Sequence, residues 1–446
     1  MTTSTNYWPK SWDDVAVPET EAEAKTITIA CRQRLVVMED CLRRRALGSK
    51  RKAARLVRRF LHSDSAKIAM MEGALAKKGR RGVSNRTLIQ MATAIRADQF
   101  SGEPVWKSLV ERADGKFRMT YSFGPIEYAR QKLAHQALKI FTPIAASQFM
   151  HSGGVPAAAH WLSLNVRSKT WVTTTDIPDC FLRQSRLPFE SGGFLPKSVM
   201  TSVLFEPMLV AKQRKPMVLG GELVSSLQQE FYSDAGPAPE RGIPPGSAPS
   251  SLLVDMRLGE LARSAELASE GVMVGNYLDD FIILAPTKKA ADVTFEALYQ
   301  SILAEYGADA AEQVRHRRKT STGKDGFVFL GDNYVRQKRR LVRTIHAGKA
   351  DAYAARLAQK IQLENLSPER IEASLLGWTM HHSYDPSTKG LAEEFRDDFM
   401  PKGEIMPDEK GHNTGVKRSI FPFRTFLTAI QGHVIEAFAR GRRLVP

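Results

Sequence analysis

Cysteine is scarce in this sequence, whose 446 residues include only Cys31, Cys41 and Cys180. They form no CxxC pair and are too few for a disulfide scaffold, which disfavours both a structural zinc site and an oxidising compartment. No uninterrupted apolar run approaches the ~18 residues that a membrane-spanning helix needs. The first residues, MTTSTNYWPKSWDD, also lack the basic-then-apolar order of a signal peptide. We therefore expect a cytoplasmic protein without a membrane partner.

Acidic residues are also fewer than basic ones. The chain has 64 Lys and Arg against 48 Asp and Glu, a net charge of +16 that is typical of proteins with a polyanionic partner. Residues 43–59, RRRALGSKRKAARLVRR, contain no acidic residue. A solvated helix face would explain one such run, but further basic clusters at 77–81, 315–319 and 338–343 favour a phosphate-binding groove. The candidate RNA-binding residues are Arg43, Arg44, Arg45, Lys50, Arg51, Lys52, Arg55, Arg58 and Arg59.

The composition, 43% hydrophobic and 25% charged, excludes a disordered or fibrous chain and predicts several globular domains. Apolar spacing predicts consecutive helices over 21–95. Strand patterns follow at 112–123 and 171–177, with a helix over 125–140 between them, and residues 326–335 predict a further short strand pair. Glycine and proline break up 183–240, where we assign no element. Later helices are expected after 250, around 295–303, beyond 344, after the Ser367-Pro368 start signal, and at 423–440.

The strongest chemical signal is VMVGNYLDDFIILA at 272–285, which has a polar centre between two β-rich apolar arms. This pattern predicts a hairpin that exposes Asp279 and Asp280 while its arms are buried. Adjacent carboxylates resist joint ionisation unless a cation neutralises them. Asp-Asp is also common in turns without any function. Asp176, which closes the strand WVTTTD, would complete a carboxylate cage for two divalent ions, the arrangement that catalyses phosphoryl transfer.

The order of these segments resembles the palm of the reverse transcriptases. An Asp-ended strand is followed by GIPPGSAPSSLL, by YLDD in a hairpin, by a Lys-Thr segment and by FLG, and the resemblance covers about residues 112–390. It implies an α+β fold, the right-hand polymerase, whose palm is an antiparallel sheet carrying the YxDD hairpin. The implied division is a basic helical N-terminal region at 1–110, fingers at 111–170, a palm at 171–343 with an irregular insertion at 183–240, a helical thumb at 344–400, and a C-terminal tail with a final helix at 401–446.

The resemblance also implies a role for individual residues. Asp176, Asp279 and Asp280 would be catalytic and, with the backbone carbonyl of Ile177, would hold two Mg²⁺ ions, for which Mn²⁺ is an alternative. Phe181 matches the aromatic gate against a ribose 2′-hydroxyl, although a core aromatic is an ordinary alternative there. The implied nucleotide-binding residues are Lys116, Arg118, Phe181, Gly246, Ser247, Tyr277 and Lys319, and the implied primer grip is Phe329, Leu330 and Gly331. For His381 and His382 we expect packing or RNA contact and not metal binding.

Pro245 departs from the family pattern, which has Gln there, and it offers neither a side-chain amide nor a backbone N–H. The resemblance favours the retron-like, abortive-infection and phage-defence groups of bacterial reverse transcriptases. It implies an RNA-directed DNA polymerase that uses dNTPs, copies an RNA template or a dedicated non-coding RNA into DNA, and acts in antiviral defence. Two alternatives stay open: a template-independent or protein-templated polymerase making low-complexity DNA, and a catalytically silent RNA-binding scaffold. A homo-oligomer or a second protein subunit also stays open.

Overall fold

A computed structural model of the chain describes residues 12–46, 50–80, 82–111, 117–142, 144–186, 188–189, 195–213, 241–364, 367–385 and 387–399. The chain divides into two compact units, which are treated separately below. The first comprises Met1–Leu330 and Tyr334–Val342, and the second comprises Gly331–Asn333 and Arg343–Pro446. Over the described residues, no helix is long and apolar enough to cross a membrane.

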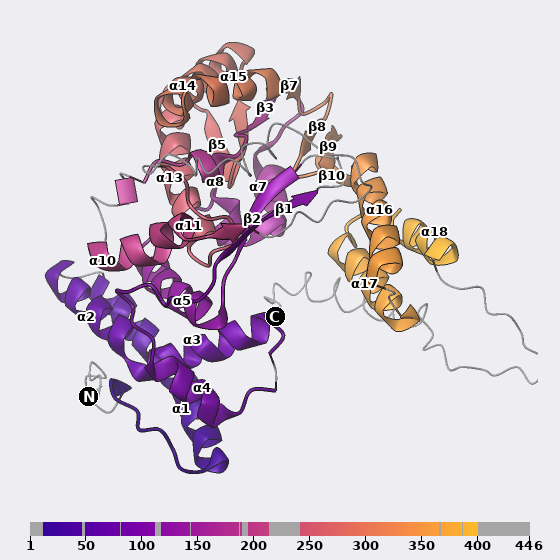
Figure 1. Ribbon diagram of the computed structural model, residues 1–446. Helices are drawn as coiled ribbons and strands as arrows, with labels where there is room; N and C mark the ends of the chain where they lie inside the picture. The colour runs from indigo at the N-terminus through magenta and orange to yellow at the C-terminus, as the bar shows by residue number, and fades with distance from the viewer. Residues whose placement is uncertain are drawn as a thin grey trace, which may run out of the picture. The chain divides into compact units, whose positions relative to one another are not determined.

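The predicted helices between residues 21 and 95 are confirmed. They are α1 (Glu21–Ala46), α2 (Lys50–His62), α3 (Asp64–Lys77) and α4 (Asn85–Thr93). Helix α3 is the central one and contacts α1, α2, α4 and α5 (Figure 1). Its sequence, DSAKIAMMEGALAK, is rich in small and apolar residues, so most of its surface can be buried between neighbours.

A small sheet follows these helices. Strands β1 (Trp106–Glu111) and β2 (Phe117–Ser122) pair antiparallel, and the short β4 (Lys212–Gln213) pairs parallel to β1. Helix α5 (Pro125–Phe141) begins with proline in its first turn, where a missing N–H costs nothing. The predicted strand and helix are therefore confirmed from Phe117 onward, while residues 112–116 lie outside the described part of the chain.

The central sheet has the order β5-β6-β3-β7 and is antiparallel throughout. Its strands are β3 (Trp171–Asp176), β5 (Met273–Tyr277), β6 (Asp280–Ala285) and β7 (Lys319–Thr322). One face packs against α13 (Ser250–Glu266), α14 (Lys288–Tyr306) and α15 (Ala308–Arg317) (Figure 1). Toward the other face lie α6 (Phe149–Ser152) and α7 (Gly154–Asn165), whose Phe149 and Leu162 share a core cluster with Ile282 and Leu284 of β6.

Strand β6 illustrates why its sequence is almost wholly apolar. Phe281 and Ile283 belong to the larger core on the helical side, whereas Ile282 and Leu284 belong to the smaller core on the opposite side. Alternate side chains of a strand point to opposite faces, so a strand covered on both faces needs apolar residues at every position. This double burial fixes the strand that carries Asp280.

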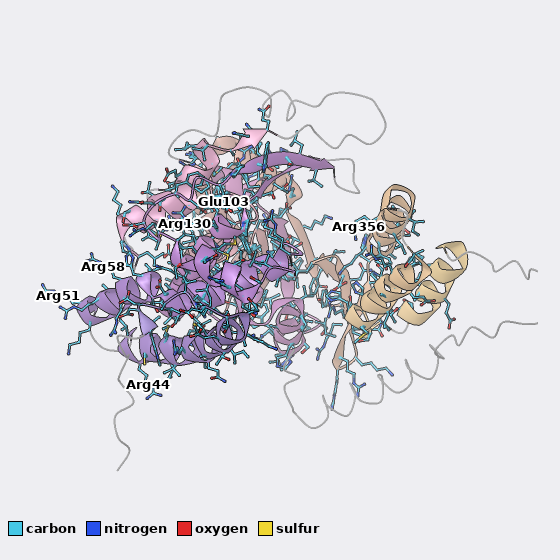
Figure 2. All side chains as sticks on the ribbon, turned by 60° about the horizontal axis from the view of Figure 1, so that its bottom comes forward. Arg44, Arg51, Arg58, Glu103, Arg130 and Arg356 are labelled. Atoms are coloured by element: carbon cyan, nitrogen blue, oxygen red, sulfur yellow. The ribbon has the colours of Figure 1, made fainter. Side chains whose placement is uncertain are left out.

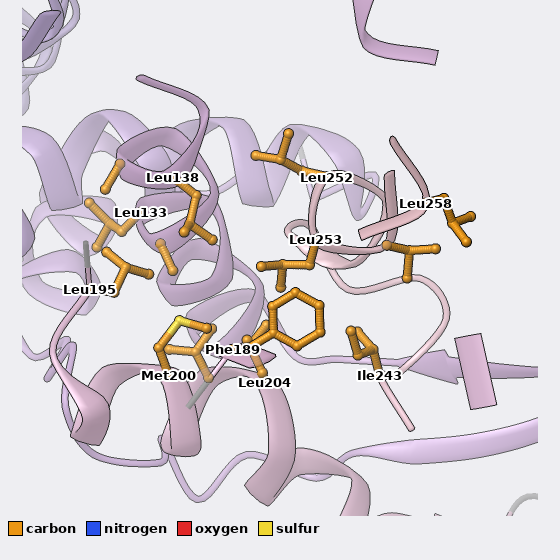
Figure 3. Packing of buried hydrophobic residues seen from close by; sticks show 14 of the residues in the cluster. Leu133, Leu138, Phe189, Leu195, Met200, Leu204, Ile243, Leu252, Leu253 and Leu258 are labelled. Carbon is orange, nitrogen blue, oxygen red and sulfur yellow. The ribbon is translucent and has the colours of Figure 1, made fainter. Parts of the chain in front are cut away.

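The tract from 183 to 240 was expected to be irregular, and its described part contains helices. They are α8 (Cys180–Arg183, ending at the boundary), α10 (Lys197–Met200), the π-helix η2 (Thr201–Phe205) and α11 (Glu206–Leu209). Met200 and Leu204 pack with leucines of α5 and α13 (Figure 3). The buried Arg130 of α5 donates hydrogen bonds to Glu127 at 2.9 Å and to the Ser202 hydroxyl at 2.9 Å. The prediction of an irregular segment was therefore wrong over 197–209. Long-range packing holds helices there that are too short to show a periodic pattern. Residues 214–240 lie outside the described part of the chain.

A third sheet has the order β10-β9-β8. Its strands are β8 (Phe327–Phe329), β9 (Asp332–Gln337) and β10 (Arg340–Ile345), which confirms the strand pair predicted at 326–335. The helices beyond it are α16 (Ala347–Glu364), α17 (Pro368–His381) and α18 (Thr388–Phe399).

The helices of the second unit pack around Leu375, Trp378 and Phe395. The start of α17 after Ser367 is confirmed, although the Ser367 side chain makes no capping hydrogen bond. The helix expected at 423–440 lies outside the described residues. The architecture is thus a mixed α+β fold, and the names fingers, palm and thumb, with their boundaries, stay a prediction.

Candidate functional site

The three aspartates singled out by the sequence meet at one end of the central sheet. Asp176 is the last residue of β3 and lies directly opposite Asp280, the first residue of β6, in the antiparallel register. Asp279 occupies the two-residue turn between β5 and β6, and its carbonyl accepts a hydrogen bond from the Ile177 N–H at 3.1 Å. Strand pairing therefore brings together carboxylates that are far apart along the chain.

The electrostatics of this cluster are unbalanced. Burial, together with the negative charges of Asp279 and Asp176, raises the pKa of Asp280 to about 7. Burial and the charges of Asp280 and Asp255 also raise the pKa of the neighbouring Tyr277 hydroxyl. A carboxyl group with such a raised pKa is one whose charged form lacks compensation, so the cluster would gain free energy from a cation.

Arg317 supplies part of the missing positive charge. It lies at the C-terminal end of α15 and forms an ion pair with Asp176. Arg315 and Arg318 on either side have other acidic partners: Arg315 pairs with Glu296 and Glu312, and Arg318 pairs with Asp292. The sequence showed these residues only as part of a basic cluster, and the individual role of Arg317 was missed.

Side-chain chemistry at this end of the sheet suits a hard divalent cation. Within the described ranges, no three Asp, Glu, His or Cys side chains are already arranged around a common metal position. The available donors are carboxylate oxygens of Asp176, Asp279 and Asp280 and the nearby backbone of Ile177, and oxygen is the ligand type that Mg²⁺ requires. The raised pKa of Asp280 is the structural observation that favours a cation at this position.

The turn that carries Asp279 has an unusual backbone. Leu278 has φ +52°, in the left-handed region, which costs a residue other than glycine roughly 1–2 kcal/mol. Two-residue hairpin turns nevertheless favour positive φ at their first central residue. The Asn276 side chain donates to the Leu278 carbonyl at 3.4 Å and to the buried Asp255 carboxylate of α13 at 2.7 Å. These contacts hold the turn, so Asp255 and Asn276 are site residues that the sequence did not reveal.

A second loop, residues 242–251, is attached to the segment that follows Asp176. The Ile243 N–H donates to the Phe181 carbonyl at 2.7 Å, and the Gly242 N–H donates to the Gln184 carbonyl at 2.8 Å. The Phe181 side chain is half-buried and packs against the larger core. This partial exposure is compatible with both interpretations of Phe181, as a gate and as a core aromatic.

Pro245 and Gly246 bind the same loop to strand β2. The Pro245 carbonyl accepts a hydrogen bond from the Tyr121 N–H at 3.1 Å. Gly246 has φ +95°, and a Cβ built there would lie 3.0 Å from the Tyr121 carbonyl oxygen, so this position requires glycine. The Ser247 hydroxyl is buried against the Ser250 hydroxyl, where it stabilises the loop itself.

The remaining predicted nucleotide and primer residues are more scattered. Arg118 is a β2 residue opposite Val110, and Lys116 lies outside the described residues. Lys319 is exposed at the start of β7, paired with Thr174 of β3. Phe329 is buried in the smaller core, and Leu330 and Gly331 form the β8–β9 turn with φ values of +53° and +76°. The hairpin shape predicted for these last three is confirmed, and their function in gripping a primer stays a prediction.

The basic run 43–59 separates into two groups. On α2, Arg51, Lys52, Arg55 and Arg58 are exposed, and the opposite face buries Ala53, Val57, Phe60 and Leu61. Arg51 and Arg58 project outward from this helix (Figure 2). By contrast, the exposed Arg43 and Arg44 pair with Glu39 and Asp40, and Arg59 pairs with Asp13. Arg45 lies in α1 and Lys50 begins α2.

The two candidate histidines belong to the second unit. His382 is buried, its ring lies 5.1 Å from the Trp378 ring, and its Nδ1 is 2.9 Å from the Tyr384 hydroxyl. Burial and the nearby positive charges of Lys349 and His381 lower the pKa of His382 to about 4. This environment favours a neutral packing histidine.

Comparison with known proteins finds similarity to solved structures, one of which is a telomerase. No protein-family model and no curated protein matches the sequence. The telomerase of Candida albicans, solved in complex with a TWJ fragment of telomeric RNA, is similar in structure, with a TM-score of 0.43 and 12% sequence identity over 78% of this chain. The chain spans 60% of the length of that telomerase chain.

Proposed function

We propose that this protein is an RNA-directed DNA polymerase, a nucleotidyltransferase of the reverse-transcriptase type. The observation that carries the proposal is the register of β3 and β6, which sets Asp176 opposite Asp280 beside the Leu278–Asp279 turn. The YLDD sequence of this hairpin and the preceding GIPPGS loop are the motifs that resemble the family. The unbalanced charge at Asp280 supports a cation-dependent reaction.

In this proposal Asp176, Asp279 and Asp280 would hold two Mg²⁺ ions with help from the Ile177 carbonyl. Divalent ions held in this way activate an attacking hydroxyl and neutralise charge on the transferred phosphate. The chain itself positions the carboxylates, because two of them belong to paired strands and the third to a tight turn. Asp176, which pairs with Arg317, would exchange that partner for the cation.

Nucleotide selection is assigned to Phe181 and the 242–251 loop, which are joined by the Ile243–Phe181 hydrogen bond. Phe181→Ala should raise the ratio of ribonucleotide to deoxyribonucleotide incorporation by about tenfold, a change of roughly 1.4 kcal/mol in the relative barriers. Phe181→Tyr, which keeps the ring, is the matched control and should retain the deoxy preference. An unchanged ratio in Phe181→Ala would make Phe181 a core aromatic.

The RNA partner is assigned to the exposed basic face of α2. Arg51, Arg55 and Arg58 follow a spacing of four and three residues and so lie along one side of the helix. A dedicated non-coding RNA, a role in phage defence and a retron-like relationship are the finer parts of this proposal, and they rest on the sequence resemblance.

A second candidate is DNA synthesis without a nucleic-acid template. It is favoured by Pro245, whose carbonyl is engaged by Tyr121 and which has no amide to offer a template-nucleotide pair. In this alternative, protein side chains select the base and the product has low complexity.

One experiment separates these functions. Purified protein is incubated with Mg²⁺ and each dNTP, with and without a primed heteropolymeric RNA, and the products are sequenced; Asp279→Asn is the inactive control. Complementary DNA made only with RNA supports the proposed function, and low-complexity DNA made without RNA supports the second candidate. RNA binding without any incorporation would identify a silent scaffold and contradict both.

A further inference from the structure

Asp255 is a carboxyl group in a place where an apolar residue is expected. It lies on α13 in the sequence LLVDM, beside the buried Leu252, Leu253 and Val254, and none of its surface is exposed. Asp255 takes no part in the reaction proposed above. The carboxyl group faces β5, where Asn276 is equally buried.

The two side chains share one hydrogen bond and leave two oxygens without a partner. The Asn276 Nδ2 donates to Asp255 Oδ1 at 2.7 Å. The other carboxyl oxygen, Asp255 Oδ2, and the amide oxygen, Asn276 Oδ1, are both buried and accept no hydrogen bond. Buried acceptors without a donor are costly, and two of them on partners already in contact call for a common explanation.

A single proton on Asp255 satisfies both oxygens. The protonated Oδ2 becomes a donor, and Asn276 Oδ1 is the unpartnered acceptor on the side chain that Asp255 already contacts. A hydrogen bond between these two atoms completes a two-hydrogen-bond pair between an acid and an amide. We propose that Asp255 is held as the neutral acid, paired with Asn276 in this way, and that the pair positions the Leu278–Asp279 turn for catalysis. This inference rests on the function proposed above.

The surroundings of Asp255 shift its ionisation equilibrium toward the neutral form. Burial raises its pKa to about 6, although the contacts with the Asn276 side chain and the Leu278 backbone oppose the rise. A hydrogen bond that the acid donates to Asn276 Oδ1 acts in the opposite direction to these contacts. It raises the pKa of Asp255 further, because it exists only when the acid is neutral. The titratable neighbours on β5 and β6, Tyr277 and Asp280, bring no positive charge to offset this.

The pair is well placed to act on the turn. Asn276 donates to the carbonyl of the strained Leu278 at 3.4 Å, and its own N–H donates to the Ser147 carbonyl at 2.8 Å. On the other side, the Gln148 Nε2 donates to the Asp255 backbone carbonyl at 2.7 Å. Asp255 and Asn276 thus connect a helix, a strand and the 147–148 segment to the residue before Asp279. They are positioning residues, since neither carries the reaction.

Four variants test the pair in the full-length protein. Asp255→Asn replaces the neutral acid by an amide of the same shape and should keep kcat within twofold of the parent. Asp255→Ala should lower kcat at least thirtyfold with little change in the KM for dNTP. Asn276→Asp places two carboxyl groups side by side and should lower kcat as much as Asp255→Ala does. The exchange variant, Asp255→Asn with Asn276→Asp, restores one acid and one amide and should recover activity.

Thr294→Ala is the matched control for a buried polar group away from the turn. Thr294 is fully buried on α14 and its hydroxyl has no hydrogen-bond partner, so this variant reports any general effect of changing the core. It should leave kcat unchanged. A loss of kcat in Asp255→Asn as large as that in Asp255→Ala would overturn the inference, because it would show that the charged carboxylate is needed.

A measurement independent of activity distinguishes this inference from the proposed function. The infrared difference spectrum between the parent and Asp255→Asn should contain the C=O stretch of a protonated carboxylic acid at pH 7. If it does while the parent incorporates no nucleotide, the acid–amide pair stands and the proposed function fails. If the band is absent at pH 7, the pair is overturned, whatever the activity.

Discussion

Asp280 and Asp332 occupy matching places in two hairpins and have opposite electrostatics. Each is the first residue of a strand after a two-residue turn, and in both turns the leucine has a left-handed backbone, at Leu278 and at Leu330. Asp280 has two other carboxylates as neighbours, and burial with their charges raises its pKa to about 7. Burial would also raise the pKa of Asp332, but hydrogen bonds from Tyr384, Arg343 and Lys349 outweigh it and lower that pKa.

The comparison separates a structural carboxylate from a candidate catalytic one. Asp332 is fully buried, its two oxygens are engaged by Arg343 at 2.6 Å, by Lys349 at 3.0 Å and by Tyr384 at 2.7 Å, and its charge is compensated. In the cluster around Asp280, the ion pair between Arg317 and Asp176 does not keep the pKa of Asp280 at its usual value. A group whose charge the fold leaves uncompensated is a better candidate for binding a cation than one that the fold already satisfies.

The largest effect is expected from Asp279→Asn, which removes one carboxylate from the candidate site. Nucleotide incorporation should fall at least a thousandfold, about 4 kcal/mol in the activation barrier, while the fold and RNA binding remain. Incorporation is measured by primer extension, and RNA binding by filter retention. Activity within tenfold of the parent would contradict the assignment of this aspartate.

Asp332→Ala should instead act on stability. It removes the buried carboxylate that Arg343 and Lys349 both contact, which should lower the free energy of unfolding by about 3 kcal/mol. Because the pKa of Asp332 is lowered in the folded state, its contribution is present above the ordinary Asp pKa of about 4 and is lost as the pH falls through the folded value. Urea unfolding from pH 7 to pH 3 tests this. If the free energies of unfolding of parent and variant differ equally at both pH values, the charge of Asp332 does not contribute to stability.

Asp280→Asn should stabilise the fold when a chelator removes divalent ions, whereas Asp332→Ala should destabilise it. It takes one negative charge from a crowded cluster, so the free energy of unfolding in EDTA should rise by about 1–2 kcal/mol, after allowance for partial exposure. Added Mg²⁺ should stabilise the parent more than the variant, since binding to the folded state raises stability by mass action. Asp332→Asn is the control and should be destabilising. If Asp280→Asn is destabilised as well, the two carboxylates do not differ in the way described.

The smallest effect per residue is expected on α2. Replacing Arg51, Lys52, Arg55 and Arg58 by Ala should weaken RNA binding and flatten its salt dependence, by about 0.7–0.9 in log-log slope for each phosphate that the variant no longer neutralises. Replacing Arg43 and Arg44, which already pair with Glu39 and Asp40, is the matched control and should change the slope less. Affinity is measured between about 50 and 200 mM salt. A larger change in the control would place the RNA along α1.

The hairpin could be predicted because its signal is local. Apolar arms around YLDD require burial on both sides, and this leaves the turn and the strand end beside it for the two aspartates. The convergence with Asp176 was expected because this residue closes the strand WVTTTD, and the register of β3 and β6 shows it directly. Helices α1 to α4 followed from ordinary periodicity in the same way.

Other features depend on partners distant in the chain. The helical stretch at 197–209 is held by α5 and α13, so its own short segments carry no recognisable period. Arg317 was counted among phosphate-binding cations, whereas the end of α15 brings it to Asp176. Asp255 fits a helical pattern on α13, and the asparagine that donates a hydrogen bond to it comes from β5, which is distant in the sequence.

The hairpin at YLDD, the helices between residues 21 and 95 and the strand that ends in Asp176 could be predicted from the amino-acid sequence, because each depends on residues that are neighbours along the chain. Which charges are compensated depends instead on the tertiary structure. Asp280 and Asp332 have the same side chain and similar turns, and their pKa values move in opposite directions because other elements bring carboxylates to one and cations to the other. Coulomb interactions depend on separation in space, which the order of residues does not specify.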